Sequence, residues 1–482
     1  MNSYRVEYGT DALIFRQNEA IVEERSCSGD DYDRFRQWID TYNKALEELH
    51  NRKAFLETGK ELYTWLDEKG FLKNALEHGE TPLIIEFQIP KRSDEIQDAF
   101  IEVPWELLAD EKGWLAQDQT IKFSPVRRIG EEKPKDEKSV PSQYRLNTLF
   151  MAASPRNVKP ELNYELEESA ILHLHTKYGL EMDLFVEESG ELEQLIRLAA
   201  NRKPVDVVHI SCHGNIKDNK PILCLENDTG NPKEVNPDDF SDIFSENRPA
   251  LTFLSACKSA EAHETDNTSE NKQLSSFSHA LIKRGFPALL GWSGSVYDSE
   301  AIRFASALYH ELTISSTVEN AVARARASLF VPPKEERAEE KINHESRNWH
   351  LARLYLGTDG GGKINESNKQ RFDRQKDSGI KEFLGKKEKG LEVAGRNEFV
   401  GRRREIQKIL KEFKENSQAG VLIHGMGNQG KSSLAARIAN RMHNHKILLV
   451  YGKKGDERFY SARNVLNEFK SVTSENETVK LI

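Results

Sequence analysis

The sequence predicts an α/β protein whose mostly parallel sheet is flanked by helices and is followed by part of a second domain of the P-loop type. Apolar strand-like runs alternate with amphipathic helical stretches between residues 146 and 356, which is typical of a parallel sheet covered on both faces. A chain of 482 residues is too long for one ordinary core, and length alone indicates about three domains. A glycine-rich phosphate-loop motif marks the second domain.

The composition describes a polar protein. Charged residues make up 30% of the chain and hydrophobic residues 37%, and no apolar run approaches the roughly 20 residues that span a bilayer. The first residues lack the basic start and apolar stretch of a secretory signal, so we expect a cytoplasmic protein with no membrane partner. A net charge of −9 indicates no nucleic-acid partner.

The four cysteines, Cys27, Cys212, Cys224 and Cys257, are too few for a disulfide framework in a chain of this length. Reduced thiols fit a reducing compartment.

The first part of the chain, residues 1–140, mixes helices with strands. Apolar side chains recur every three or four residues from 32 to 76 and predict amphipathic helix. Residues 81–87 read as a strand followed by a charged loop, and Pro104 begins a turn that enters a short helix at 103–108. A hydrophilic stretch, 131–142, ends this part.

Residues 141–358 carry the alternating pattern. Strands are predicted at 146–153, 180–186, 205–214, 251–257 and 288–292, with a hairpin-like insert before 251, and the unit is expected to close near 349–356. Helices are predicted at 162–174, 192–200, 275–284, 300–312 and 318–329. Residues 359–395 are lysine-rich and read as a flexible linker. In the last part, 396–482, we expect a helix at 404–413 and a strand at 420–423.

Two of the apolar strands end in residues suited to cysteine-protease chemistry. The run from 205 leads to His213, and the run from 251 leads to Cys257. If the strands are neighbours, both residues lie at the carboxyl edge of the sheet, where His213 can take the proton of the Cys257 thiol. The N–H groups of Gly214 and Cys257 are candidate oxyanion donors.

Other interpretations of these residues stay open. A cysteine at a strand end is often a small buried hydrophobe. A metal site of His209, Cys212, His213, Cys224 and Cys257 is disfavoured because side chains alternate faces along a strand, so His209 and Cys212 point apart. We therefore predict no metal, and we interpret His209 as a core histidine.

Six segments in order carry a resemblance to a known family. They are VPWELL at 103–108, SPVRR at 124–128, AASPR at 152–156, HISCHG at 209–214, LSAC at 254–257 and GWSG at 291–294. Together they look like the CHAT domain of the caspase-like, clan CD peptidases, over roughly residues 4–357. The resemblance implies a caspase-like sheet, cysteine endopeptidase activity without a cofactor, His213 as catalytic histidine and Cys257 as nucleophile. It also implies that the first part of the chain belongs to the same module.

The resemblance points to residues 291–298 as the segment that shapes the substrate pocket. Trp292, Ser293 and Asp298 are the candidates, and Asp298 could pair with a Lys or Arg side chain of a protein substrate. Equally, Asp298 could cap the helix that we expect near Glu300. The polar insert at 258–273 is expected to be a mobile loop over the site.

The segment GMGNQGKS at 425–432 fits the Walker A pattern. We expect a strand at 421–424 before it and a helix at 432–442 after it. Gly425, Gly427 and Gly430 would let the backbone wrap phosphates, Lys431 would approach the β and γ phosphates, and the Ser432 hydroxyl would ligate Mg²⁺, so ATP and Mg²⁺ are the expected cofactors of the complete domain.

Residues 399–402, FVGR, resemble the entry motif of STAND-type signalling NTPases. No acidic Walker B strand is present, so we interpret the chain as a fragment that ends inside this domain. The expected whole is a protease gated by a nucleotide switch, an effector in prokaryotic antiviral defence or programmed cell death. A missing C-terminal part would sense a trigger protein, and the NTPase could oligomerise. The alternative is a non-proteolytic CHAT scaffold.

Overall fold

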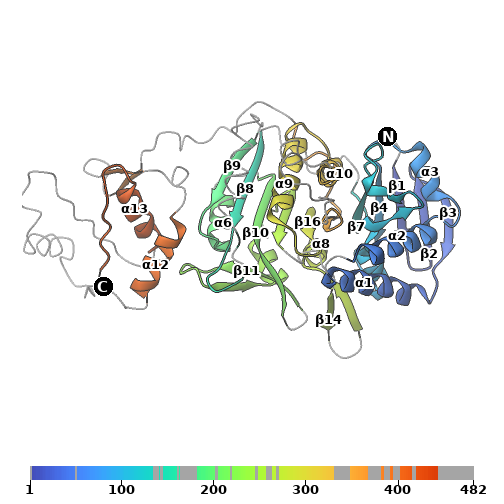
Figure 1. Ribbon diagram of the computed structural model, residues 1–482, viewed down its shortest axis with the longest axis horizontal. Helices are drawn as coiled ribbons and strands as arrows, with labels where there is room; N and C mark the ends of the chain where they lie inside the picture. Colours follow the sequence, from blue (N-terminus) through green and yellow to red (C-terminus); the bar gives the residue numbers. More distant parts are fainter. Residues whose placement is uncertain are drawn as a thin grey trace, which may run out of the picture. The chain divides into compact units, whose positions relative to one another are not determined.

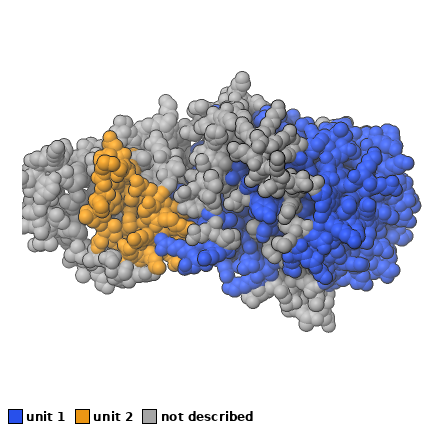
Figure 2. Space-filling view, viewed as in Figure 1, with its two compact units in different colours: residues 1–226, 232–373 blue, residues 227–231, 374–482 orange. Residues whose placement is uncertain are grey.

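The computed structural model describes most of the chain. The described residues are 3–48, 51–133, 141, 145–159, 162, 182–200, 205–217, 220–244, 248–256, 263–267, 271–330, 348–366, 382–384, 391–393, 402–414 and 420–442. They belong to two compact units, residues 1–226 with 232–373 and residues 227–231 with 374–482, which Figure 2 colours separately. The helix predicted at 162–174, except for its first residue, and the nucleophile candidate Cys257 lie outside the described residues.

Thirteen strands of the described residues form one large mixed sheet in the first unit. They are β1 (Tyr4–Tyr8), β2 (Ala12–Gln17), β3 (Ala20–Ser26), β4 (Ile84–Ile89), β7 (Ser124–Ile129), β8 (Leu146–Ala152), β9 (Met182–Glu187), β10 (Val207–Lys217), β11 (Lys220–Glu226), β12 (Pro232–Val235), β13 (Leu251–Ala256), β16 (Ala288–Trp292) and β17 (Ala352–Leu356).

The sheet contains two parallel blocks that run in opposite directions. One block has the order β9-β8-β10-β13-β16, and the other has the order β17-β7-β4-β1. The blocks meet where β16 pairs antiparallel with β17. Antiparallel β2 and β3 extend one edge, and the hairpin β11–β12 extends the outer half of β10. Figure 1 shows β8, β9 and β10 side by side. The predicted mostly parallel α/β sheet is therefore confirmed.

Helices pack against this sheet. They are α1 (Asp31–Glu47), α2 (Arg52–Leu66), α3 (Phe71–His78), α4 (Glu95–Glu102), α6 (Leu192–Ala200), α7 (Pro237–Ile243), α8 (Phe277–Lys283), α9 (Asp298–Thr313) and α10 (Val318–Ser328), with short 3₁₀ turns η1 (Trp105–Leu107) and η2 (Leu115–Gln117). No helix within the described ranges has both the length and the apolar character that crossing a membrane requires.

The helical stretch predicted at 32–76 is confirmed but divided into α1, α2 and α3. Asn51 caps α2, its side chain accepting from the Ala54 N–H at 3.2 Å. Gly70 precedes α3 with a φ of 83°, which a residue without a Cβ adopts readily.

Three segments contain a helix or a hairpin that was not predicted. Helix α4 forms where we expected a charged loop, because Asp94 and Gln97 make a reciprocal capping box. The insert expected as a mobile loop contains the hairpin β14–β15, His263–Asn267 with Asn271–Ser275. The expected linker contains a short hairpin β18–β19, Glu382–Leu384 with Leu391–Val393.

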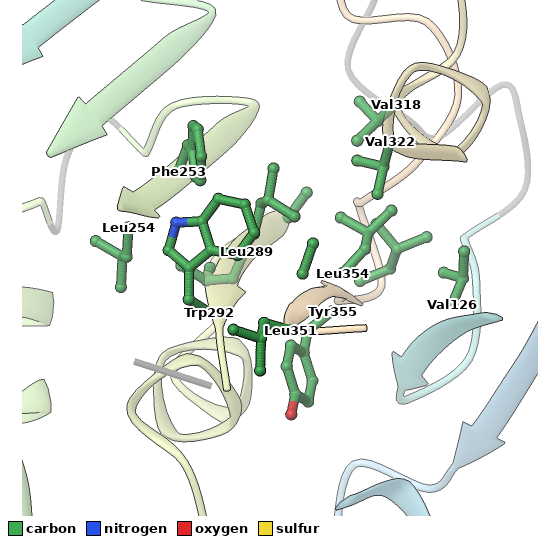
Figure 3. Close-up of a cluster of buried hydrophobic side chains, with 14 of the residues drawn as sticks. Val126, Phe253, Leu254, Leu289, Trp292, Val318, Val322, Leu351, Leu354 and Tyr355 are labelled. Carbon is green, nitrogen blue, oxygen red and sulfur yellow. The ribbon is translucent and has the colours of Figure 1, made fainter. Parts of the chain in front are cut away.

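One hydrophobic core runs through the first unit. Figure 3 shows Val126 of β7 and Tyr355 of β17 in the same cluster as Leu289 and Trp292 of β16 and Phe253 of β13. Strands from the first 140 residues and from residues 288–356 thus share both a sheet and a core. These parts lie in one compact unit.

The second unit has a small core of its own. Helices α12 (Arg403–Lys414) and α13 (Lys431–Arg441) pack through Ile406, Ile409, Leu410, Leu434 and Ile438. Both helices were predicted. The strand predicted at 420–424 is wrong, because these residues form no strand and Leu422 is 82% exposed. A strand needs a neighbour to satisfy its backbone, and the described residues supply none here. A P-loop domain is therefore not formed by the described part of the second unit.

Candidate active site

The histidine strand and the cysteine strand are neighbours, as predicted. Strand β10 pairs in parallel with β13 from Val207↔Leu251 to Cys212↔Ala256. His213 therefore comes directly after the last paired residue of one strand, and Cys257 follows the last paired residue of the other in the sequence. Consecutive Cα atoms lie about 3.8 Å apart, so covalent geometry ties Cys257 closely to the end of β13.

Strand β10 does not end at His213. From His213 onward it pairs antiparallel with β11, and His213 lies opposite Cys224. Gly214 is part of this antiparallel extension and is partly exposed. The sequence missed the extension because the polar residues beyond Gly214 show no apolar alternation.

Cys224 is the second thiol next to His213. Burial raises the pKa of the Cys224 thiol, and the nearby carboxylates of Glu234 and Glu226 raise it further. A thiol held in its protonated form is a poor nucleophile. Cys212 is buried, and alternation along β10 directs its side chain to the face opposite to that of His213. These environments disfavour both described cysteines of the region as nucleophiles.

Metal ligands do not gather in the described residues. Within the ranges given above, no group of three or more His, Cys, Asp or Glu side chains is arranged to hold a metal ion.

His209 lies in the core, as predicted. Its ring is fully buried, stacks on Phe253 with centroids 4.3 Å apart, and places Nδ1 2.9 Å from the Tyr309 hydroxyl. Burial lowers the pKa of His209 to about 3, so the ring is neutral at physiological pH.

We expect His209 to make the folded state sensitive to acid. Between pH 6.5 and 3 the unfolded chain protonates this ring and the folded chain does not, so stability falls as pH falls in that window. Lowering the pH from 7.5 to 5.5 should remove about 1.4 kcal/mol through this group. Urea unfolding of wild type and His209→Phe at both pH values measures the effect. Other titrating groups cancel in the difference, and equal pH dependence of the two proteins would contradict the assignment.

The predicted substrate segment begins inside the core. Trp292 is fully buried against Phe253 and Phe304, with ring centroids 6.1 and 5.0 Å away. Ser293 is also fully buried. Helix α9 starts at Asp298 rather than near Glu300, which puts Tyr297 at the N-cap position. The side chain of Asp298 lies outside the described atoms.

A buried ion-pair network, which the sequence did not reveal, lies beside η1. Glu106 and Arg127 form a bidentate pair at 2.6 and 2.8 Å, and neither side chain is exposed. Arg326 of α10 and Arg353 of β17 approach the same carboxylate at 3.7 and 4.0 Å. Burial alone would raise the pKa of Glu106, but these arginines outweigh it and lower the pKa. The network joins residues far apart in the sequence.

The network continues to α8. His279 Nδ1 lies 2.9 Å from Glu102 Oε1, and Lys283 Nζ lies 2.8 Å from Asp98 Oδ1. Tyr355 donates to Glu102 at 2.7 Å. Burial would lower the pKa of His279, but Asp98 and Glu102 raise it overall. These contacts hold α8, the helix that follows β15 in the sequence.

The phosphate-loop residues lie in the second unit. Three of the residues have positive φ, namely Gly425 at 150°, Asn428 at 61° and Gly430 at 71°. Lys431 Nζ donates to the Met426 carbonyl at 2.5 Å, and Gly427 and Ser432 are exposed.

The family model of the CHAT domain matches residues 56–357. No curated protein sequence matches the chain.

Among solved structures, the chain is similar to a chain of the Saccharomyces cerevisiae separase–securin complex, at 14% identity and a TM-score of 0.34, over 58% of this chain and 16% of that one. It is similar to the Arg-specific cysteine proteinase gingipain R of Porphyromonas gingivalis, at 12% identity and a TM-score of 0.36, over 65% of this chain and 68% of that one. It is also similar to the Drosophila initiator caspase Dronc, at 11% identity and a TM-score of 0.30, over 50% of this chain and 94% of that one. The chain spans less than a quarter of the separase chains.

Proposed function

The chain belongs to the CHAT domain family, and on this premise we propose that it is a cysteine endopeptidase with His213 and Cys257 as its catalytic pair. The substrate is a protein, and the protease part needs no cofactor.

The register of β10 and β13 is the observation that carries the proposal. Because Cys212 pairs with Ala256, the residues that follow both strands start from adjacent positions at one edge of the sheet. Carboxyl ends of parallel strands are where open α/β sheets hold their functional residues. Cys224 of β11 also lies next to His213, but the pKa of its thiol is raised, which makes it a poorer nucleophile. This favours Cys257 as the nucleophile.

In the proposed mechanism His213 takes the proton from the Cys257 Sγ, and the thiolate attacks the carbonyl carbon of the peptide bond. The N–H groups of Gly214 and Cys257 bind the oxyanion that forms. His213 then returns the proton to the leaving amine, which leaves a thioester on Cys257. A water molecule, deprotonated by His213, hydrolyses the thioester and releases the new carboxylate and the thiol.

The substrate segment 291–298 is proposed to select the residue before the cleaved bond. Asp298 would pair with a Lys or Arg side chain of the substrate. Trp292 and Ser293 are buried, so they would act by holding the segment rather than by touching the substrate.

We propose further that the protease is gated by a STAND-type NTPase switch in a prokaryotic antiviral or cell-death system. The support is the Walker A sequence and its positive-φ positions, which let successive N–H groups face one phosphate. Gly425, Gly427, Gly430 and Lys431 would hold the phosphates of ATP, and Ser432 would hold Mg²⁺; ATP hydrolysis would supply the switching energy. A trigger protein and oligomerisation through the NTPase belong to this proposal.

Digestion of a diverse peptide library, read by mass spectrometry, tests the proteolytic function. We expect cleavage by the wild-type chain and none by Cys257→Ala, with Lys or Arg before the cut if Asp298 forms the pocket base. Cleavage that persists in Cys257→Ala would sink the assigned nucleophile. Absence of cleavage by both, together with an unchanged biological output of Cys257→Ala, would favour the non-proteolytic scaffold.

A further inference from the structure

The loop after β16 begins beside the end of β13, the strand that precedes the proposed nucleophile in the sequence. We call residues 293–297 the post-β16 loop. Strand β16 pairs in parallel with β13, and the last registered pair is Leu254↔Gly291. One residue further on, Trp292 Nε1 donates to Ser255 Oγ at 3.4 Å, so β16 and β13 are still adjacent at this point. The loop therefore leaves the sheet next to the strand end that precedes Cys257.

The first residue of the loop is held by two hydrogen bonds. The Ser293 N–H donates to the Leu351 carbonyl at 2.8 Å, and Ser293 Oγ lies 2.8 Å from the Tyr42 hydroxyl. That hydroxyl lies 3.0 Å from His350 Nδ1. Tyr42, Ser293 and His350 are all buried, so water does not compete for these bonds. Tyr42 comes from α1 and is separated from Ser293 by 251 positions of sequence.

The end of the loop is held by the same segment of chain. Glu300, in the first turn of α9, accepts a hydrogen bond from the Asn348 side-chain amide, and both side chains are buried. Residues 348–351 thus contact the structure on both sides of the loop. Between these anchors the loop turns outward, and Tyr297 is 57% exposed.

We propose that Tyr42 is a positioning residue for substrate binding, acting through Ser293 on the post-β16 loop; this inference rests on the proposed protease function. A loop that contacts a substrate binds best when its ends are fixed before the substrate arrives, because less motion is then lost on binding. The Tyr42 hydroxyl fixes one end. The aromatic ring has a separate role, since it packs against Phe55 and the Arg353 guanidinium.

Tyr42→Phe tests this role because it removes the hydroxyl and keeps the ring. We expect KM for cleaved peptides to rise about 3- to 10-fold, the size of one net hydrogen bond, while kcat changes less than about 2-fold. Ser293→Ala should show the same split, and the double variant should be no worse than either single one. Amide hydrogen exchange over 293–299 should become faster in Tyr42→Phe.

Tyr8→Phe is the matched control. It also removes a buried tyrosine hydroxyl, which donates to Asp31 at 3.1 Å, from the same part of the chain. We expect it to lower stability without changing KM or exchange over 293–299. If the wild type cleaves peptides and Tyr42→Phe has the same KM and the same exchange rate over 293–299 as the wild type, the positioning role of Tyr42 is wrong and the protease function stands. If the wild type cleaves no peptide while Tyr42→Phe still speeds exchange, the proposed function fails, and the contact is structural only.

Discussion

Glu106→Gln is expected to lower the free energy of unfolding of the first unit by about 3–5 kcal/mol. This is the usual cost of removing one charge of a buried ion pair, because the other charge is left buried without its partner. The substitution keeps the shape of the side chain and removes only its charge. Arg127 would then remain buried with Arg326 and Arg353 nearby and with one carboxylate fewer to balance three guanidinium groups.

Urea unfolding followed by tryptophan fluorescence measures this effect. Glu57→Gln is the matched control, because Glu57 pairs with Lys53 at 3.7 Å with both side chains largely exposed. That change should stay within about 0.5 kcal/mol. A loss below 1 kcal/mol in Glu106→Gln would show that the network contributes little to stability.

The network also has a defined response to acid. The pKa of Glu106 is 4.5 in the unfolded chain and lower in the folded chain. Its contribution to stability is therefore complete above pH 4.5, and it is lost as the pH falls through the pKa of the folded state. Glu106→Gln should therefore lose less stability than wild type when both are acidified below pH 4.5. Parallel pH curves for the two proteins would contradict this.

His213→Ala is expected to lower kcat/KM for peptide cleavage by about 10³-fold or more, because the thiol of Cys257 would lose the base that activates it. Cys257→Ala should be at least as severe. The double variant should be no worse than Cys257→Ala, since the two side chains act as one unit.

Cys224→Ser is the matched control for this pair. Cys224 lies opposite His213 in the antiparallel register, but its raised pKa keeps it protonated. We expect its replacement to leave kcat/KM within about 3-fold and iodoacetamide to label Cys257 faster than Cys224 at neutral pH. Loss of activity in Cys224→Ser with retained activity in Cys257→Ala would reverse the assignment.

Much of the fold was predictable because local pattern decides local structure. Helix α6 and strand β16 have the predicted bounds, since an amphipathic period and a short apolar run are visible within a few residues. Helix α4 was missed although Asp94 and Gln97 show the spacing of a capping box. The charged composition of that segment hid the signal.

Contacts between distant residues were not predictable from the sequence. Glu106 and Arg127 stand in two of the segments that identify the family, yet neither segment shows that they pair. Tyr42 lies in no motif, and the GWSG segment that contains Ser293 does not show that Ser293 contacts Tyr42. The strand expected before the phosphate loop failed for a related reason, because Val421 and Leu422 have strand-like side chains but no neighbouring strand among the described residues. A segment forms a strand only beside a neighbouring strand, and the periodicity of its apolar residues does not show whether such a neighbour exists.

The pairing of β17 with both β16 and β7 has a consequence for synthesis of the chain. Strand β7 pairs with β4 on one side, but on its other side Arg127 and Arg128 pair with Tyr355 and Leu356, which are made more than 200 residues later. While the ribosome makes the intervening residues, β7 has an open strand edge, and β16 later adds another. Such edges pair readily with other chains. The last strand of the sheet closes both at once, so nascent chains that stall before residue 356 are the species we expect chaperones to bind and aggregates to contain.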